Sequence, residues 1–156
     1  MHFRHTQETD YLPVISVIDH WWGGRHMADM LPKLFFQHFQ NTSFIAEQDG
    51  QIIGFLIGFV SQTDPAESYV HFIGVHPAHR KNGVANRLYE MFFEAVRKKG
   101  CTVVRCVTSP VNKTSISFHT QLGFRIANGA REEDGVPVQA DYDGIGQDRV
   151  LFIKNL

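Results

Sequence analysis

Residues 68–88 read SYVHFIGVHPAHRKNGVANRL, and this stretch decides the fold. Its first part, residues 69–75, is rich in β-branched and aromatic residues, a composition typical of strands. Pro77 ends the strand because proline lacks a backbone N–H and holds His76 in an extended conformation. From Val84 onward, apolar residues recur at the spacing of an amphipathic helix. The stretch therefore predicts a strand, a short loop and a helix.

The loop between this strand and this helix has the composition of an anion-binding site. It consists of Arg80, Lys81, Asn82, Gly83, Val84 and Ala85. The small residues at Gly83 and Ala85 let a ligand approach the backbone closely, and the first helical turn carries no acidic side chain. Free N–H groups at a helix start attract anions because the helix dipole adds positive potential there. The alternative is an ordinary turn in which the glycine serves only a steric purpose.

Length, composition and charge favour a single globular domain. The 156 residues are enough to form one hydrophobic core but too few for two domains of typical size. We therefore predict one domain spanning residues 1–156. The hydrophobic fraction of 43% and the charged fraction of 20% are near globular averages. A formal net charge of −1 gives no long-range attraction to nucleic acid, so nucleic acid is not expected as a partner.

The sequence also favours a cytoplasmic protein that does not enter membranes. The first ten residues lack the apolar core of a signal peptide, and no apolar run approaches the ~20 residues that a membrane span needs. Cys101 and Cys106 are expected in one strand at an odd spacing, on opposite faces, where they cannot form a disulfide with each other. A reducing compartment fits this arrangement.

The remaining sequence predicts further strands and helices. Strands are expected at 2–6, 42–47, 52–60, 102–108, 122–126 and 149–153, and helices at about 10–18, 27–39 and 113–121. The Asp49-Gly50 pair predicts a hairpin turn. Gly54 and Gly58 share one face of the returning strand, where they leave room for a helix or a ligand. Residues 130–147 are expected to be irregular, and such stretches are usually disordered or functional.

Two blocks of the sequence resemble the acyl-CoA-binding pattern of the GNAT superfamily of N-acetyltransferases. The first block is VHPAHRKNGVA at residues 75–85, and the second is NKTSISFHTQLGF at residues 112–124. The second is similar to the family pattern N-x-x-A-x-x-[FL]-Y-x-x-x-G-F, with Ser115 in place of alanine and His119 in place of tyrosine. The resemblance covers most of residues 42–127. It implies an α/β protein of the α+β type, with a mixed, largely antiparallel central sheet flanked by helices.

The same resemblance implies a reaction and a cosubstrate. Family members transfer an acetyl group from acetyl-CoA to a primary amine by direct attack in a ternary complex, without a metal ion or a covalent enzyme intermediate. The residues that it places at coenzyme A are Ile73, Gly74, Val75, Arg80, Lys81, Asn82, Gly83, Val84, Ala85, Asn112 and His119. A backbone N–H near Gly74 or Val75 is expected at the thioester carbonyl, and Asn112 at the pantetheine arm or the substrate.

Two histidines are the candidate catalytic residues. His119 is expected to donate a proton to the leaving thiolate because imidazole titrates near neutral pH. We expect His119→Ala to lower turnover much more than it raises the KM for acetyl-CoA. His71, expected on the same side of its strand as Ile73 and Val75, is a candidate base or water anchor. The alternatives are a surface position for His119 and a purely structural role for His71. The other histidines lack the spacing of a metal site, so no metal is expected.

The acceptor is expected between two segments that the family usually places around it. One is the Trp21-Trp22-Gly23-Gly24 turn, which is alternatively a helix end buried in the core, and the other is the acidic stretch at residues 130–147. Carboxylates favour a cationic amine, and tryptophan rings can bind it by cation–π contact. We expect a small amine, an amino acid or an amino sugar. The alternatives are protein N-acetylation and a non-catalytic, sensory acyl-CoA-binding domain. A homodimer is a further expectation of the resemblance.

Overall fold

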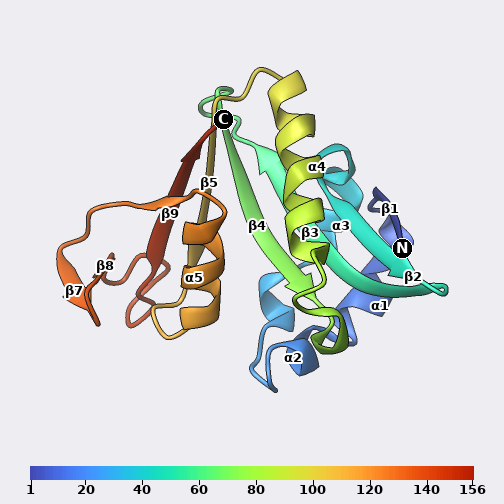
Figure 1. Ribbon diagram of the computed structural model, residues 1–156, viewed down its shortest axis with the longest axis horizontal. Helices are drawn as coiled ribbons and strands as arrows, with labels where there is room; N and C mark the ends of the chain where they lie inside the picture. Colours follow the sequence, from blue (N-terminus) through green and yellow to red (C-terminus); the bar gives the residue numbers. More distant parts are fainter.

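A seven-stranded sheet forms the centre of the molecule (Figure 1). In the computed structural model, which describes residues 1–156, its strands are β1 (His2–His5), β2 (Phe44–Gln48), β3 (Gln51–Val60), β4 (Glu67–Val75), β5 (Val103–Thr108), β6 (Arg125–Ile126) and β9 (Val150–Asn155). Their order across the sheet is β1-β2-β3-β4-β5-β9-β6, and only the β4–β5 pair is parallel. The predicted mixed, largely antiparallel sheet is confirmed.

Helices cover both faces of this sheet. The α-helices are α1 (Tyr11–Ile15), α2 (Ile18–Trp21), α3 (Leu34–His38), α4 (Val84–Lys98) and α5 (Lys113–Gln121). Short 3₁₀ helices lie at Glu8–Asp10, Ala28–Met30, Gln40–Thr42 and Pro77–His79. Helices α4 and α5 lie in front of the sheet in Figure 1, and α1 to α3 lie behind it. No helix combines the length and the apolar character that crossing a lipid bilayer requires.

Two glycines of β3 let α4 pack directly on the sheet. A Cβ added at Gly58 would lie 2.4 Å from Cε2 of Phe92, and one added at Gly54 would lie 2.9 Å from Cγ1 of Val84. Real Cβ atoms do not approach other atoms so closely, so the missing side chains create the space that the helix occupies. Of the two uses predicted for these glycines, helix packing is the one observed.

Two predicted helices are interrupted. The helix expected at 27–39 is a 3₁₀ turn, Ala28–Met30, followed by α3, with Pro32 between them. The single-helix prediction was wrong because proline removes a backbone donor and its ring clashes with the preceding turn. The helix expected at about 10–18 is likewise divided into α1 and α2, and the Ser16 hydroxyl between them donates to the Pro13 carbonyl at 2.9 Å.

The C-terminal part holds a hairpin that the sequence did not predict. Within residues 130–147, β7 (Arg131–Glu133) pairs with β8 (Val136–Val138) across an Asp134-Gly135 turn whose φ angles are 51° and 78°. Positive φ at both central residues is the geometry of a tight hairpin turn. The stretch expected to be irregular therefore contains a regular hairpin at residues 131–138. Pro137 and the exposed charges of β7 hide the alternating pattern by which strands are recognised.

The cysteine prediction was wrong in its geometry. Cys101 precedes β5, which begins at Val103, so the two cysteines do not alternate along one strand. Both side chains are buried in the same core beneath α4, and both are free thiols.

Candidate active site

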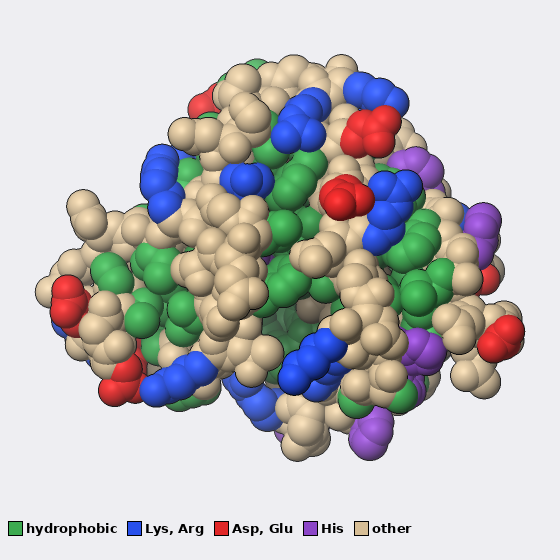
Figure 2. Space-filling view, in the orientation of Figure 1, with side chains coloured by type: hydrophobic (Ala, Val, Ile, Leu, Met, Phe, Trp, Pro, Cys, Tyr) green, Lys and Arg blue, Asp and Glu red, His purple; other side chains and the backbone are tan.

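A cleft opens where β4 and β5 separate. Strand β4 pairs with β3 as far as Val75, but its pairing with β5 covers only residues 67–69. Beyond that point the two strands diverge, and a cleft of about 1450 Å³ lies between them. Figure 2 shows the surface hollowed between α5 and the start of α4, with a basic side chain at the lower rim of the hollow.

The β4 edge that faces this cleft presents free backbone groups. The His76 N–H donates to the Ile53 carbonyl of β3 at 2.8 Å. Successive residues of a strand direct their N–H groups to opposite sides, so Val75 and Ile73 direct theirs away from β3 and into the cleft. The Gly74 N–H points toward β3 instead. Gly74 contributes space, because a Cβ added there would lie 2.6 Å from the Trp22 ring.

The start of α4 leaves several backbone N–H groups without a partner in the chain. No group of the chain accepts a hydrogen bond from the N–H groups of residues 81–86, and the first bond of the helix runs from the Arg87 N–H to the Gly83 carbonyl at 3.0 Å. Lys81 and Gly83 have positive φ angles of 65° and 78°. Such turns direct several N–H groups toward one point, and the helix dipole adds to their attraction for an anion.

The two cations of this loop differ in their surroundings. Arg80 donates to the carbonyl of Val75 at 3.2 Å and to the carbonyl of Trp21. It therefore joins the end of β4 to the end of α2. The Lys81 side chain is exposed and forms no ion pair within the chain, so its charge is available to a ligand.

A β-bulge turns His71 away from the face that was expected. Ile57 pairs with Phe72 and Gly58 pairs with Val70, so His71 is an extra residue in β4. Its ring stacks on Phe35 of α3, with centroids 4.3 Å apart and planes 3° apart. The prediction that His71 faces the same side as Ile73 and Val75 was wrong, since those two pack under α4. A bulge places two consecutive side chains on one face, which simple alternation does not anticipate.

The hydrogen bonding of His71 leaves one ring nitrogen free to accept a proton. Nε2 lies 2.5 Å from the Met30 carbonyl. A carbonyl can only accept, so Nε2 carries the proton and Nδ1 keeps its lone pair. Burial lowers the pKa of His71, with an opposing contribution from the Met30 bond, so the ring is neutral at physiological pH. His71 contributes to the wall of the cleft.

His119 is buried and both of its ring nitrogens are hydrogen bonded. Only 5% of the residue is exposed, and its ring stacks on Phe152 with centroids 4.8 Å apart. Nδ1 donates to the Ser115 carbonyl at 2.8 Å, and Nε2 accepts from the Tyr89 hydroxyl at 2.7 Å. Burial lowers the pKa of His119, so the ring carries a single proton, on Nδ1. The surface position considered as an alternative is not the one observed.

Asn112 begins α5 and keeps a donor free. Its Oδ1 accepts from the Ser115 N–H at 3.1 Å, which caps the helix. The amide nitrogen of Asn112 has no partner in the chain, and the residue lies in the cleft wall. The cap and the ligand contact predicted for this asparagine are therefore compatible.

Tyr89 is a polar residue of the cleft that the sequence analysis missed. It lies in the buried stripe of α4 between Leu88 and Phe92, where an aromatic residue is read as core. The available signal was the hydroxyl, because a buried tyrosine needs a hydrogen-bond partner. That partner, His119, is far away in the sequence.

The end of the cleft at which the acceptor was expected is less acidic than its sequence indicates. Trp21 is buried, as the alternative of a buried helix end predicted, and Trp22 lies edge-on to Phe72; both side chains contribute to the cleft wall. Of the five carboxylates in the acidic stretch, Asp134, Asp143 and Glu133 form ion pairs with Lys113, Arg149 and Arg131. Its carboxylates thus attract a cationic amine less strongly than their number indicates.

Comparisons with known proteins agree with this geometry. A model of the acetyltransferase (GNAT) family matches residues 10–124. An L-2,4-diaminobutyric acid acetyltransferase of Nocardia farcinica is 29% identical over 92 residues, which are 59% of this chain and 48% of that protein. The chain thus spans about half the length of this relative. An acetyltransferase of Yersinia pestis is 26% identical over 129 residues, covering 80% of this chain and 87% of the relative.

Solved structures share the fold. Ard1 from Thermoplasma volcanium superposes with a TM-score of 0.80 at 17% identity, covering 99% of this chain and 97% of that one. The diaminobutyrate acetyltransferase EctA from Paenibacillus lautus, solved with its substrate and coenzyme A, gives 0.72 at 22% identity, covering 99% and 93%. At these identities the similarity shows the fold alone.

Proposed function

Because the chain belongs to the GNAT family of acetyltransferases, we propose that it transfers an acetyl group from acetyl-CoA to the primary amine of a small molecule, by direct attack in a ternary complex. The observation that carries the proposal is the combination of free N–H groups at residues 81–86 with the open edge of β4. The N–H groups of residues 81–86 suit a pyrophosphate, and the open edge of β4 suits the extended, amide-bearing pantetheine arm.

In this proposal the backbone holds most of the cosubstrate. The N–H groups of residues 81–86 bind the pyrophosphate, with Lys81 adding charge. The pantetheine arm lies along β4 in the place of a neighbouring strand, where the N–H groups of Ile73 and Val75 receive its amide and the thioester carbonyl. The free amide nitrogen of Asn112 donates to the same arm from the opposite wall.

His71 acts as the base. The attacking amine must lose a proton as its nitrogen bonds to the acetyl carbon, and Nδ1 of His71 accepts this proton, directly or through one water molecule. The lowered pKa keeps His71 neutral and ready to accept. Collapse of the tetrahedral intermediate breaks the carbon–sulfur bond and leaves the electron pair on the sulfur of coenzyme A.

We propose a small amine as the acceptor because apolar and aromatic side chains line the cleft beside His71. Trp22, Met27 and Met30 supply apolar contact surface beside His71, and an indole ring can also bind a cationic amine. The name of the Nocardia relative gives an amino acid as its substrate, which belongs to the same chemical class.

Release of free thiol from acetyl-CoA tests the proposal. The purified protein is assayed with diamino acids, polyamines, amino sugars, aryl-alkyl amines and peptides, and products are identified by mass spectrometry. We expect amine-dependent thiol release with at least one small amine. Acetylation of peptide N-termini or lysines alone would refute the small-molecule acceptor. Binding of coenzyme A without turnover on any amine would favour a sensory domain.

A further inference from the structure

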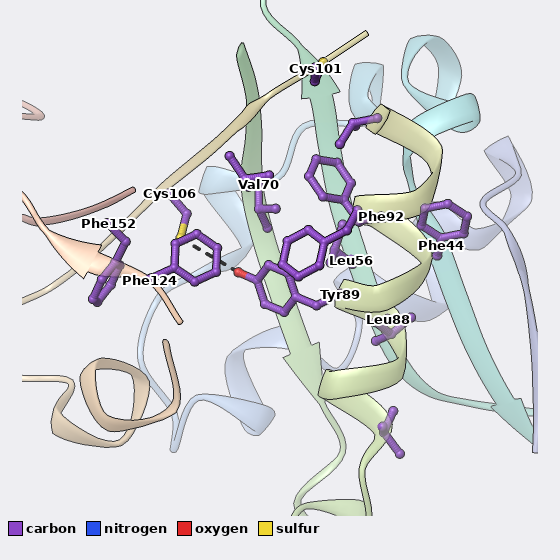
Figure 3. Close-up of a cluster of buried hydrophobic side chains, with 14 of the residues drawn as sticks. Phe44, Leu56, Val70, Leu88, Tyr89, Phe92, Cys101, Cys106, Phe124 and Phe152 are labelled. Atoms are coloured by element: carbon purple, nitrogen blue, oxygen red, sulfur yellow. Dashed lines mark hydrogen bonds between the residues drawn. The ribbon is translucent and has the colours of Figure 1, made fainter. Parts of the chain in front are cut away.

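The buried stripe of α4 contains one hydroxyl, that of Tyr89. The side chain points from α4 toward β5, where its oxygen lies 3.8 Å from the sulfur of Cys106 (Figure 3). The same oxygen lies 2.7 Å from Nε2 of His119. Tyr89 is 0% exposed, yet Tyr89, Cys106 and His119 all contribute to the wall of the cleft. Cys106 follows Arg105, the last β5 residue that pairs with β4, so the three side chains lie at the inner end of the cleft, where the two strands separate.

At this inner end, His119 has no N–H group free to donate a hydrogen bond to a ligand. Its Nδ1–H is held by the Ser115 carbonyl, which can only accept. Its Nε2 has no proton and accepts from Tyr89 instead. A neutral histidine in this tautomer has no further N–H to offer. The donors that remain in this group are the Cys106 thiol, which donates only weakly, and the Tyr89 hydroxyl, whose hydrogen can turn from His119 to another acceptor.

The leaving sulfur needs such a donor. An arm that enters at the start of α4 and follows the free edge of β4 has its thioester toward the inner end of the cleft. We propose that the Tyr89 hydroxyl donates a hydrogen bond to the departing sulfur and that His119 positions this hydroxyl. The inference rests on the proposed acetyl transfer.

In this step Tyr89 donates a hydrogen bond and does not transfer its proton. As the carbon–sulfur bond breaks, the electron pair stays on sulfur, and the Tyr89 O–H turns from Nε2 of His119 to this thiolate. The tyrosine keeps its proton, because burial raises its pKa well above 10. The thiolate takes a proton from solvent after coenzyme A leaves the cleft. Tyr89 is thus the catalytic residue here, and His119 is a positioning residue.

Moving the hydroxyl tests the proposal. Tyr89→Phe is expected to lower kcat on the order of 10- to 100-fold, with the KM for acetyl-CoA within about twofold of wild type. Two double variants then differ by a single hydroxyl: Tyr89→Phe combined with His119→Tyr, and Tyr89→Phe combined with His119→Phe. Both remove the unpaired Nε2 that Tyr89→Phe leaves behind. We expect the His119→Tyr combination to recover most of kcat and the His119→Phe combination to stay low.

Stability controls separate chemistry from folding. Each variant is assayed well below its unfolding midpoint, beside Val96→Ala, which shortens another buried α4 side chain away from the cleft and is expected to keep the wild-type kcat. A Tyr89→Phe kcat within twofold of wild type would overturn the inference, as would equal kcat values for the two double variants. Absence of acetyl transfer by the wild-type protein would overturn the proposed function, and this inference with it.

Discussion

The extra residue in β4 decides which way the candidate base faces. Alternation counted back from Ile73 would direct His71 toward the apolar core under α4, but Val70 already packs in that core because the bulge lies between the two. The bulge instead places the ring between Phe35 and the Met30 carbonyl, in the wall of the cleft at the proposed acceptor end. A single inserted residue therefore supplies both the orientation and the tautomer that a base requires.

The base role of His71 predicts a pH effect. In wild type, kcat/KM is expected to fall as the pH drops through the lowered pKa of His71, because the protonated ring accepts no further proton. In His71→Gln, the plateau is expected to fall on the order of 100-fold and this acidic limb to disappear. Steady-state assays across pH measure both effects. An unchanged profile would contradict the role, and His38→Gln, an exposed α3 residue, serves as the control.

At the scale of elements, the two ends of α4 offer a matched pair of glycines. Gly83 precedes the helix and Gly100 follows it, with φ angles of 78° and 92° and no atom within 4 Å of an added Cβ at either position. Alanine at either position therefore meets the same backbone strain of about 1–2 kcal/mol. Only Gly83 belongs to the proposed pyrophosphate site.

Gly83→Ala is expected to raise the KM for acetyl-CoA on the order of 5- to 10-fold, because relief of the strain turns N–H groups away from the anion. Gly100→Ala is expected to lose similar stability and keep the wild-type KM. Steady-state kinetics and thermal unfolding of both variants provide the comparison. If the two variants showed the same KM, the loop would have no special part in binding.

The contact between β3 and α4 predicts a coupled effect on stability. Gly58→Ala adds a methyl group where Phe92 already lies, so we expect a loss of about 1–3 kcal/mol in the free energy of unfolding. Phe92→Leu in the same chain shortens the ring and should recover part of this loss. Urea denaturation of the single and double variants measures the coupling. Additive losses would show that the helix shifts away from the strand instead.

Much of the fold could be predicted because its signals are local. The α5 boundaries and the Asp49-Gly50 hairpin follow from residues that are neighbours in the sequence. The prediction failed where a long apolar pattern hid a breaker, as at Pro32. It also failed where pairing between distant segments decided the result. The bulge at His71 and the bond between Tyr89 and His119 are of this kind, because neither has a local pattern.

At the scale of the whole molecule, two neutral histidines lie in separate parts of the structure. His71 stacks on Phe35 of α3, which lies behind the sheet in Figure 1. His119 belongs to α5, which lies in front of the sheet, and stacks on Phe152 of β9. Burial is the main cause of the lowered pKa in both cases. Both rings release their protons when the chain folds at mildly acidic pH, so acid should oppose folding.

The stability of the fold is therefore expected to depend on pH. The pKa of each histidine is lower in the folded chain than its ordinary value of 6.5, so the unfolded chain binds more protons below that pH. The contribution of the two neutral histidines to stability is complete above about pH 6.5. It is lost as the pH falls through their pKa values in the folded chain. Asp19, Asp134 and Asp148 also have lowered pKa values, but these lie below 3.8 and act at lower pH.

Between pH 7 and pH 5, the pH dependence of the free energy of unfolding therefore reports on the two histidines and not on the aspartates. We expect the free energy of unfolding in urea to fall across this window in wild type. The slope should be smaller in His119→Phe and smaller again when His71→Gln is added, because each change removes one group that takes up a proton on unfolding. The slope is the relevant quantity, since the variants also differ in packing. Equal slopes in all three proteins would show that the two rings do not govern the acid sensitivity of the fold.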